Sequence, residues 1–410
     1  MEKKFFVKDM AMEHKTNFKR LVGRVIGKYW FIVVFAVTLL IPIYGRKLDA
    51  DITLSGVTAA ADPVHMSFET LNNGTYQAFL NDVWEDGFPG KKFLLRVRNQ
   101  FLYSFFKVSP NTNVVIGKDN YLYEPAYILF ETQIYSPSSE EYFDTLGSHL
   151  AQLQGLLEEN GKELYIFITP SKAHIYRDFI PVKYELLSAE GSYSYTNYSK
   201  LLEVLEANNL KFYDSVSFVE KNIESGTFES PVFYKSGIHW SHPWGYSAAA
   251  EFLDYMNSCS KYDLSSVSVS ESVSDVPIAP DTDLYSSLNL IAEAKERWYC
   301  AESSIERLGN DRPNIFLRGG SFMGQSLIAL VQRGIFGKDV HFENNYCFTD
   351  QYSAQFTLSS FTAYDEMDLD RLLGQSDILV LEVNEGAIYT MSWGFIDYLL
   401  EHPEYLDRVY

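Results

Sequence analysis

Residues Ile315–Leu327 read IFLRGGSFMGQSL, a short apolar run that passes through two glycines and a serine into a helix-like segment. An apolar run of this kind is typical of a strand that is buried on both faces. Gly319 and Gly320 relieve the backbone strain of a sharp turn. Because ligands of open α/β sheets bind beyond the carboxyl ends of the strands, Ser321 is a candidate functional residue.

The same alternation of strand and helix extends over most of the chain. Apolar runs of strand length occupy residues 163–170, 210–215, 314–320, 339–343 and 377–383. Apolar residues at helical spacing occupy residues 140–160, 197–209, 243–256, 323–332 and 393–400. Strands separated by helices form right-handed crossovers and a parallel sheet with both faces covered. The sequence therefore predicts a three-layer α/β/α fold around a central, mostly parallel sheet.

Three further segments define the predicted domain organisation. Residues 46–110 combine a polar stalk with a helical region that Pro89 and Gly90 interrupt. The α/β domain spans residues 111–410 and begins with a hairpin over Val114–Glu124, where two β-type runs flank a Gly-Lys-Asp-Asn turn. A serine-rich stretch breaks the rhythm of strands and helices, and we interpret residues 258–300 as a surface insertion or lid.

The N-terminus has the composition of a membrane anchor. The segment Tyr29–Tyr44, YWFIVVFAVTLLIPIY, contains no charge, and with residue 45 it reaches the short end of the ~17–25 residues that a spanning helix needs. Eight lysines and arginines lie within residues 1–28, so the positive-inside rule places this segment in the cytoplasm and the acidic body outside. A cleaved signal peptide and a buried core helix are the alternatives, although the Ala59–Ala61 run lies far beyond the apolar segment.

Composition argues against several function classes. The chain has 410 residues and a formal net charge of −20, because 54 acidic residues oppose 34 basic ones. An acidic body repels phosphate backbones, which argues against nucleic-acid binding. The three cysteines form no C-x-x-C pair, which disfavours both a disulfide framework and a zinc ribbon. The sequence indicates no metal and no cofactor.

A second segment, Phe233–Gly245 (FYKSGIHWSHPWG), supplies the partner that a serine nucleophile needs. A hydroxyl is a weak nucleophile until a base removes its proton, and His239 is the candidate base for Ser321. Each signal also has a plainer interpretation, because a Gly-Gly-Ser turn is often only a helix cap and a histidine among tryptophans is often structural. His239 and His242 lack the carboxylate or cysteine that would complete a metal site.

Five blocks, in order, connect these segments to a known family. They are GKDNYLYE (Gly117–Glu124), FITPSKAHIYRDFIP (Phe167–Pro181), FYKSGIHWSHPWGYSAAAEFL (Phe233–Leu253), RGGSF (Arg318–Phe322) and LEVNE (Leu381–Glu385). From Val114 to Asn384 the chain resembles the SGNH hydrolase-like domain of the alginate O-acetylation proteins of the AlgX/AlgJ type, and the related DHHW family. The third block resembles the family's D-x-H-W block, and the fourth resembles its G-D-S-F block.

The resemblance implies a membrane-anchored, extracytoplasmic polysaccharide O-acetyltransferase or acetylesterase with a Ser-His acyl-transfer mechanism. Ser321 would be the nucleophile and His239 the base, while the Ser321 amide, helped by Gly320 or another backbone donor, would hold the oxyanion. The implied partners are a polysaccharide acceptor and a membrane-bound O-acyltransferase that supplies acetyl groups. The implied location is the cell membrane, with a single span, a cytoplasmic N-terminus and the α/β domain outside.

Two positions depart from the family pattern. Gly237 stands where the family has the acid that orients the histidine, and Gly320 stands where it has an aspartate. Loss of the orienting carboxylate of a Ser-His-Asp triad can cost ~10⁴ in rate. Asp214 or Glu382 could orient His239 instead, and a Ser-His dyad is also consistent with the sequence. The alternative function is a catalytically degenerate, carbohydrate-binding scaffold in a polysaccharide acetylation or export complex.

Other residues of the matching blocks are candidate contacts of the substrate. Lys172 follows a strand end and either contacts substrate or is a solvated lysine. Tyr234 and Trp240 either stack on a sugar ring or pack in the core. Glu382 and Asn384 end the last strand and are expected to line the cleft. A lipase or peptidase is disfavoured because no G-x-S-x-G motif surrounds the candidate serine.

Overall fold

The computed structural model describes residues 27–32, 34–36, 38–41, 43–56, 63–332, 334–337, 340–343, 347–350, 357–358, 364 and 367–407. The chain divides into two compact units. The first comprises Met1–Phe106 together with Asn289–Ala292, and the second comprises Lys107–Leu288 together with Glu293–Tyr410. The second unit contains every candidate site residue named above.

The described part of the first unit is built from helices. They include α2 (Phe68–Asn72), α3 (Thr75–Gly87), α4 (Lys91–Phe101) and a π-helical turn, η1 (Leu102–Phe106). The predicted interruption at Pro89 and Gly90 is confirmed, because Gly90 has a φ of 91° and forms the N-cap of α4. The Asp49 carboxylate accepts hydrogen bonds from the amides of Gly90 (2.8 Å) and Phe93 (3.0 Å), which satisfies two donors at the start of this helix.

The apolar N-terminal segment forms two helices, Gly27–Ile41 and Ile43–Asp49, which meet at an angle of 72°. Within the described residues, no single helix is both long enough and apolar enough to cross a membrane, whereas this bent pair meets the two criteria together. The anchor at residues 29–45 therefore stays a prediction. Most of the predicted cytoplasmic segment, residues 1–28, lies outside the described residues.

Among the described residues of the second unit, seven strands form one sheet in the order β10-β9-β8-β7-β11-β3-β4. The five neighbouring strands from β8 to β4 are parallel, whereas β9 and β10 extend the edge in antiparallel pairs. The strands are β3 (Glu163–Thr169), β4 (Phe212–Asp214), β7 (Ile315–Arg318), β8 (Val340–Glu343), β9 (Cys347–Asp350), β10 (Thr357–Leu358) and β11 (Ile378–Asn384). The predicted central, mostly parallel sheet is confirmed.

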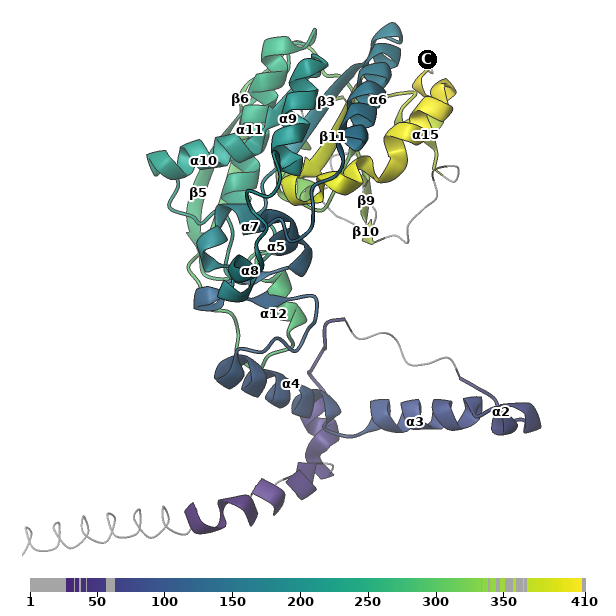
Figure 1. Ribbon diagram of the computed structural model, residues 1–410, viewed down its shortest axis with the longest axis vertical. Coiled ribbons are helices and arrows are strands. Elements are labelled where there is room, and N and C mark those ends of the chain that lie inside the picture. Colours follow the sequence, from purple (N-terminus) through teal and green to yellow (C-terminus); the bar gives the residue numbers. More distant parts are fainter. Residues whose placement is uncertain are drawn as a thin grey trace, which may run out of the picture. The chain divides into compact units, whose positions relative to one another are not determined.

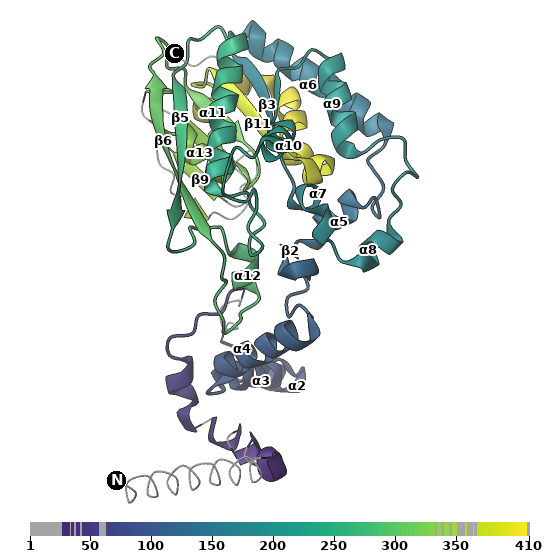
Figure 2. The ribbon, with the colours of Figure 1, turned by 90° about the vertical axis from the view of Figure 1, so that its left-hand side faces the viewer.

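Helices cover both faces of this sheet (Figure 1, Figure 2). One layer contains α6 (Glu140–Glu159), α9 (Asn197–Ala207) and α15 (Phe395–Glu401), and the opposite layer contains α11 (His242–Cys259) and α13 (Met323–Leu330). Ile166 of β3 belongs to the same buried cluster as Leu150 of α6. The next residue of β3, Phe167, instead contacts Phe252 of α11, with ring centres 4.8 Å apart. Successive residues of β3 therefore pack into opposite layers, as an apolar strand buried on both faces requires.

Shorter elements connect the layers. The predicted hairpin at Val114–Glu124 is confirmed, because β1 (Val115–Ile116) pairs antiparallel with β2 (Leu122–Tyr123). The short α-helices are α5 (Pro125–Glu131), α7 (Lys172–Ile175), α8 (Val182–Leu187), α10 (Ser215–Ser225), α12 (Asp283–Ser287) and α14 (Leu369–Leu372). The 3-10 turns are η2 (Lys118–Asn120), η3 (Arg177–Phe179), η5 (Glu385–Gly394) and η6 (Pro403–Leu406).

The serine-rich segment contains a strand that was not predicted. It forms β5 (Ser266–Ser274), which pairs antiparallel with β6 (Trp298–Arg307) in a two-stranded ribbon beside α11 (Figure 2). Valine alternates with serine along β5, and Val267 is buried while Ser268 is exposed. This period of two is the strand signal, which the high serine content obscured. The predicted insertion is thus a ribbon, and the chain between its strands includes α12.

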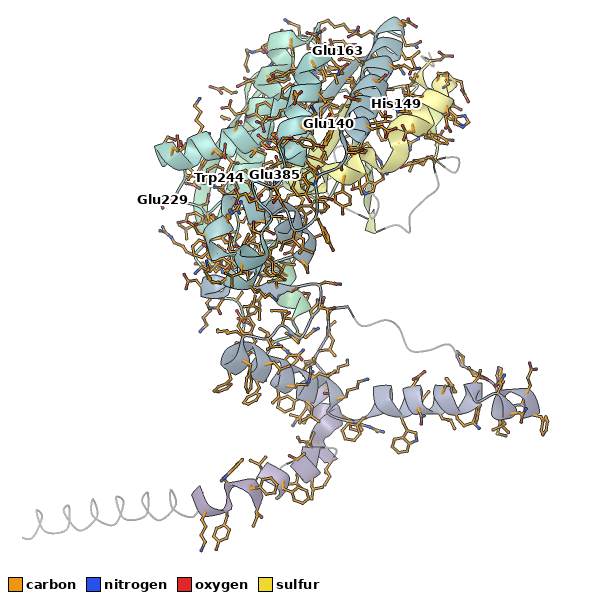
Figure 3. All side chains as sticks on the ribbon, viewed as in Figure 1. Glu140, His149, Glu163, Glu229, Trp244 and Glu385 are labelled. Carbon is orange, nitrogen blue, oxygen red and sulfur yellow. The ribbon has the colours of Figure 1, made fainter. Side chains whose placement is uncertain are left out.

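The two ends of the parallel sheet are marked by two glutamates that Figure 3 labels. Glu163 begins β3 at one end, and Glu385 directly follows β11 at the other. Because β7, β11 and β3 are adjacent and parallel, their carboxyl ends share one edge of the sheet. Ser321 follows β7 at this edge, where α/β proteins bind their ligands.

The packing of α11 against α13 predicts an opposite effect of alanine at two glycines. A Cβ at Gly245 of α11 would lie 2.5 Å from the Gln325 Cβ of α13, whereas a Cβ at Gly155 of α6 would meet nothing within 4 Å. We expect Gly245→Ala to lower the free energy of unfolding by about 1–3 kcal/mol, because overpacking separates the two helices. We expect Gly155→Ala to raise it by about 0.5–1 kcal/mol through helix propensity. Urea unfolding of both variants checks this, and equal effects would refute the close contact.

Candidate active site

The turn that carries Ser321 is held by its neighbours. A Cβ at Gly319 would lie 2.6 Å from the Glu382 Cβ, so glycine is required at that position. The Trp240 indole N–H donates a hydrogen bond of 2.9 Å to the Phe322 carbonyl oxygen, one residue beyond the serine. The Ser321 side chain itself is exposed at the start of α13. The sequence thus produces a fixed turn with an accessible hydroxyl.

His239 lies directly against this hydroxyl. Its Nε2 atom is 2.7 Å from Ser321 Oγ, although the two residues are 82 positions apart in the chain. The ring packs on Phe322 with centres 4.9 Å apart, and the His239 side chain is 14% exposed. A backbone bridge between Phe233 and Trp240 shapes the loop that presents it. The structure therefore brings together the two residues that the sequence predicted as partners.

A carboxylate completes the arrangement on the other side of the imidazole. Asp283 Oδ2 is 2.6 Å from His239 Nδ1. Its second oxygen, Oδ1, accepts hydrogen bonds from the amides of Ile238 (2.9 Å) and Leu284 (2.7 Å), so the carboxylate is held in one orientation. A carboxylate at Nδ1 fixes the tautomer that leaves Nε2 free to accept a proton from the serine. Ser321, His239 and Asp283 together have the geometry of a Ser-His-Asp triad.

Asp283 is the residue that sequence reasoning missed. It begins α12, within the segment between β5 and β6 that was predicted only as an insertion or lid. A Cβ at Gly237 would lie 2.6 Å from the Asp281 carbonyl oxygen, so this insertion occupies the space that a side chain at position 237 would need. No local motif marks Asp283 in the sequence.

Asp214, one of the two acids that the sequence left open as partners of His239, does not orient the imidazole. Its Oδ1 caps α10 by accepting a hydrogen bond of 3.0 Å from the Val216 amide. Its Oδ2 accepts a hydrogen bond of 2.7 Å from the Tyr198 hydroxyl. Asp214 is the last residue of β4, where an acidic side chain is a favoured N-cap for the following helix.

Lys172 does not lie in the cleft, contrary to the prediction of a substrate contact. The side chain is fully buried. Its ammonium donates hydrogen bonds to the carbonyl oxygens of Tyr234 (2.7 Å), Lys235 (3.0 Å) and Gly237 (2.6 Å). Burial lowers the pKa of Lys172 to about 7, although the Glu296 and Asp283 carboxylates act in the opposite direction. Lys172 thus fixes the loop that leads to His239.

Tyr234 and Trp240 pack in the core and do not present a face to a sugar. Both side chains are fully buried. The Tyr234 hydroxyl accepts a hydrogen bond of 2.7 Å from the Tyr299 amide of β6, which ties the loop to the ribbon. The Trp240 indole N–H donates its hydrogen bond to the Phe322 carbonyl oxygen of the serine turn. The plainer of the two sequence interpretations, core packing, is therefore the observed one.

Glu382 is buried beneath the serine turn. Its Oε2 accepts a hydrogen bond of 2.6 Å from the Gly320 amide, and its Oε1 accepts one of 2.5 Å from the Thr169 hydroxyl. Burial raises the pKa of Glu382 to about 7, and these two hydrogen bonds oppose the rise. The Gly320 amide is thus engaged by Glu382, which corrects the prediction that it holds an oxyanion. Glu382 also does not contact His239 as its orienting acid, because Asp283 has that place.

A cavity of about 350 Å³ opens beside Ser321. Glu382 and Asn384 line it, as predicted, although the Asn384 amide already donates a hydrogen bond of 2.8 Å to the Pro170 carbonyl oxygen. Glu124, the last residue of the predicted hairpin, also lines it. Burial raises the pKa of Glu124; the His239 charge opposes this rise and the Asp283 charge adds to it. The cavity therefore offers carboxyl groups close to the Ser-His pair.

The described residues contain no group of three or more histidine, cysteine, aspartate or glutamate side chains arranged to hold a metal ion. His242, the second histidine of its segment, instead places Nε2 3.1 Å from the Ala279 carbonyl oxygen. Burial lowers the pKa of His242. A neutral histidine that donates to a carbonyl is a structural residue.

Comparisons with known proteins address the first part of this domain. Residues 114–260 match the model of a family described as "SGNH hydrolase-like domain, acetyltransferase AlgX". The predicted resemblance to the AlgX/AlgJ type is thereby confirmed over those residues, and the relation to DHHW proteins stays a prediction. No curated protein matches the chain in sequence.

Several solved structures are similar to this chain. The O-acetyltransferase domain of Pseudomonas putida AlgJ has 16% identity and a TM-score of 0.42, with 70% of this chain and 98% of that chain covered. Pseudomonas aeruginosa AlgX has 14% identity and a TM-score of 0.38, with 69% and 66% covered. Bacillus cereus PatB1 with a sulfonyl adduct has 10% identity and a TM-score of 0.43, with 69% and 97% covered.

The raised pKa of Glu382 predicts a pH-dependent stability. A carboxyl whose pKa is 4.5 when unfolded and about 7 when folded gives stability that is fully present below pH 4.5 and is lost as the pH rises through about 7. Over this window we expect wild-type protein to lose about 3 kcal/mol relative to Glu382→Gln, because each pH unit is worth about 1.36 kcal/mol. Urea unfolding across the pH series measures the difference. The exposed Glu206→Gln serves as control, and parallel curves for wild type and Glu382→Gln would contradict the shift.

Proposed function

We propose, from the match of residues 114–260 to an SGNH hydrolase-like acetyltransferase family, that this protein is a polysaccharide O-acetyltransferase. The observation that carries the proposal is the hydrogen-bonded series Ser321–His239–Asp283 at the carboxyl end of β7. The distance of 2.7 Å between Ser321 Oγ and His239 Nε2 suits proton transfer between these two atoms, and the 2.6 Å between His239 Nδ1 and Asp283 suits a hydrogen bond that orients the imidazole. Both the family match and this geometry support acyl transfer as the proposed reaction.

The first half-reaction forms an acyl-serine. His239 Nε2 takes the proton of Ser321 Oγ while the oxygen attacks the carbonyl carbon of the acetyl donor. The tetrahedral intermediate then collapses, the bond to the leaving oxygen breaks, and that oxygen takes the proton from His239. The backbone N–H of Ser321 is the proposed donor to the oxyanion, because the Gly320 amide is engaged by Glu382.

The second half-reaction passes the acetyl group to the acceptor. A sugar hydroxyl gives its proton to His239 Nε2 and attacks the acetyl carbonyl carbon. The ester bond to Ser321 breaks, and the serine oxygen recovers the proton. Water in place of the sugar would give an acetylesterase, so exclusion of water from the cavity decides between the two activities.

Asp283 has two tasks in both half-reactions. It holds the Nδ1–H tautomer in the resting state, and it stabilises the imidazolium that forms when Nε2 takes a proton. Its own orientation is secured by two backbone amides, so no further side chain is needed. The scaffold alternative rests on the absence of an orienting acid at Gly237. The Asp283 carboxylate at His239 Nδ1 supplies such an acid and therefore favours the enzyme.

We extend the proposal to the N-terminal segment, which we assign as a membrane anchor with a cytoplasmic N-terminus. The support is the uncharged run Tyr29–Tyr44 behind eight basic residues. Anchoring would place the α/β domain outside the cytoplasm, where an exported polysaccharide is accessible. The acetyl donor would then be the membrane-bound O-acyltransferase that the family resemblance implies.

The nucleophile is tested by acylation. We expect wild-type protein incubated with p-nitrophenyl acetate to gain one acetyl group on Ser321, and Ser321→Ala to gain none, as read by peptide mass spectrometry. We expect Asp283→Asn to slow acylation by ~10⁴, because the wrong histidine tautomer then faces the serine. Asp275→Asn, an exposed aspartate of the same insertion, is the matched control and should react at the wild-type rate.

Two results would contradict the mechanism. Equal acetylation of Ser321→Ala and wild type would show that Ser321 is not the nucleophile. A wild-type rate in Asp283→Asn would show that Asp283 does not orient the histidine, without bearing on the role of the serine. Absence of any acylation together with retained polysaccharide binding would instead favour the scaffold function.

The anchor is tested by fractionation. We expect the full-length protein to stay in the membrane pellet after alkaline carbonate extraction, and a variant without residues 1–47 to be released. Protease added to cells with a permeabilised outer layer and an intact cytoplasmic membrane should degrade the α/β domain. Full-length protein recovered in the soluble cytosol would refute the anchor.

A further inference from the structure

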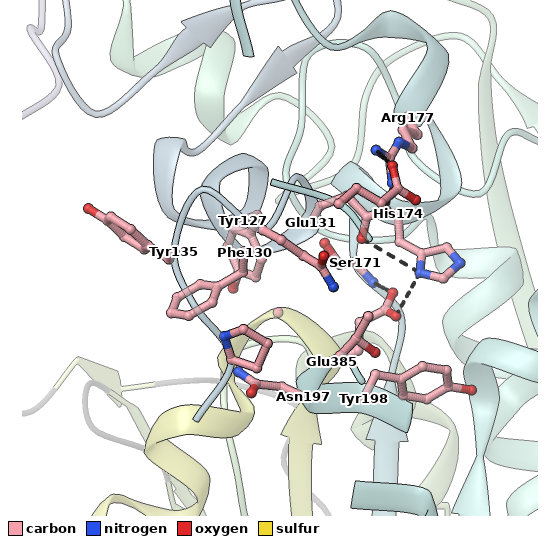
Figure 4. Close-up of a pocket in the computed structure, with 15 residues that line it drawn as sticks. Tyr127, Phe130, Glu131, Tyr135, Ser171, His174, Arg177, Asn197, Tyr198 and Glu385 are labelled. Carbon is pink, nitrogen blue, oxygen red and sulfur yellow. Dashed lines mark hydrogen bonds and ion pairs between the residues drawn. The ribbon is translucent and has the colours of Figure 1, made fainter. Parts of the chain in front are cut away.

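The α/β unit has a second cavity, of about 300 Å³, whose lining residues Figure 4 shows. This volume is at the lower end of the ~300–1,000 Å³ typical of ligand pockets. Tyr127 lines both cavities. Asn384 lines the first cavity, and the next two residues, Glu385 and Gly386, line the second. The two cavities are therefore neighbours along the same edge of the sheet.

The second cavity has oriented polar groups that the proposed reaction does not use. His174 Nδ1 is 3.0 Å from Glu385 Oε2, and Glu385 Oε1 accepts a hydrogen bond of 2.5 Å from the Ser171 amide (Figure 4). Arg177 pairs with Glu131 at 3.1 Å. The hydrogen bond with Glu385 raises the pKa of His174 to about 10, so this histidine is a cation at neutral pH. Each carboxylate oxygen keeps an acceptor site for a further hydroxyl.

Aromatic rings connect the two cavities. Tyr389 lines the first cavity, while Phe130 and Tyr135 line the second. The rings of Tyr389 and Phe130 are stacked with centres 4.5 Å apart, and Phe130 meets Tyr135 at 5.3 Å. Tyr389 is 42% exposed and Tyr135 is 49% exposed. We call these three residues the aromatic strip.

This combination matches the chemistry of a pyranose ring. Such a ring has apolar C–H faces that pack on aromatic side chains, and hydroxyls at its edge that bond to carboxylates, guanidinium and amides. The strip offers the first kind of contact. Glu385, Arg177 and Asn197, which Figure 4 shows around the cavity, offer the second.

The charges in the second cavity select against an acidic sugar. Three carboxylates, Glu131, Glu190 and Glu385, line it against two cations, Arg177 and protonated His174. The whole chain also has a net charge of −20. A uronate residue would meet repulsion from the surplus carboxylate, whereas a neutral sugar would not.

Gln133 adds an independent sign of function. It lines the cavity, yet its backbone has a φ of 53°, which strains a residue other than glycine. The residue is 5% exposed, and its Oε1 atom has no hydrogen-bond partner among the described residues. Strain and an unmet polar group concentrate at ligand sites, because elsewhere they only cost stability.

We propose that the second cavity is a distal acceptor subsite, which binds a neutral pyranose unit of the same polysaccharide chain whose other unit lies at Ser321. The sugar units that lie between the two cavities pack on the aromatic strip. This inference rests on the proposed function for the identity of the ligand, and it adds the direction of the acceptor chain and its lack of charge.

The test is binding of defined oligosaccharides to Ser321→Ala protein by calorimetry. The probes are hexasaccharides of β-1,4-linked glucose and N-acetylglucosamine, the corresponding disaccharides, and a hexauronate. We expect a neutral hexasaccharide to bind at least about tenfold tighter than its disaccharide and than the hexauronate, which corresponds to ~1.4 kcal/mol. In Tyr135→Ala and Arg177→Lys this advantage of length should vanish. Tyr193→Ala, an exposed tyrosine that lines neither cavity, should keep it.

Three results would overturn the inference. They are wild-type affinity in both Tyr135→Ala and Arg177→Lys, tightest binding by the hexauronate, and no binding by either neutral hexasaccharide. Because these measurements use Ser321→Ala protein, they do not depend on acylation. Length-dependent binding without Ser321 labelling would keep the subsite and refute the acetyltransferase. Labelling of Ser321 without length-dependent binding would support the acetyltransferase and refute the subsite.

Discussion

The loop that presents His239 is fixed by the buried ammonium of Lys172. An ammonium in the protein interior costs several kcal/mol unless its donors are satisfied, and here each of the three N–H groups can meet a carbonyl oxygen between residues 234 and 237. The loop cannot shift without exposing one of these donors to an apolar surrounding. The amide of the next residue, Ile238, donates a hydrogen bond to the Asp283 carboxylate. The geometry of the imidazole therefore depends on a lysine that never touches the cleft.

The serine turn depends on a different buried group. Glu382 supports the turn through the Gly320 amide, and the missing Cβ of Gly319 lets the two backbones approach. Trp240 connects the turn to the histidine loop through the Phe322 carbonyl oxygen. The two halves of the site are thus joined by a bond that involves neither the hydroxyl nor the imidazole. Precise placement of reacting groups comes from such supporting contacts more than from the reacting groups themselves.

The fold was predictable from the sequence because its signals are local. Apolar runs and helical spacing placed the parallel strands and their covering helices, and the family blocks paired Ser321 with His239. The acid was not predictable, because Asp283 lies in α12, between two ribbon strands, and the high serine content hid the strand pattern of the first of them. The burial of Lys172 was also missed, since polar side chains at strand ends are equally common in clefts and in hydrogen-bonded cores. Which of these environments applies is decided by tertiary contacts that no single segment encodes.

The steric link between Gly237 and the Asp281 carbonyl oxygen bears on how related chains are classified. An aspartate missing from the D-x-H-W block would ordinarily mark a pseudoenzyme. Here the same glycine makes room for a segment that brings its own carboxylate to the histidine. Surveys that score activity by one motif position would discard such chains. A search that pairs a glycine two residues before the histidine with an aspartate between two ribbon strands would retain them.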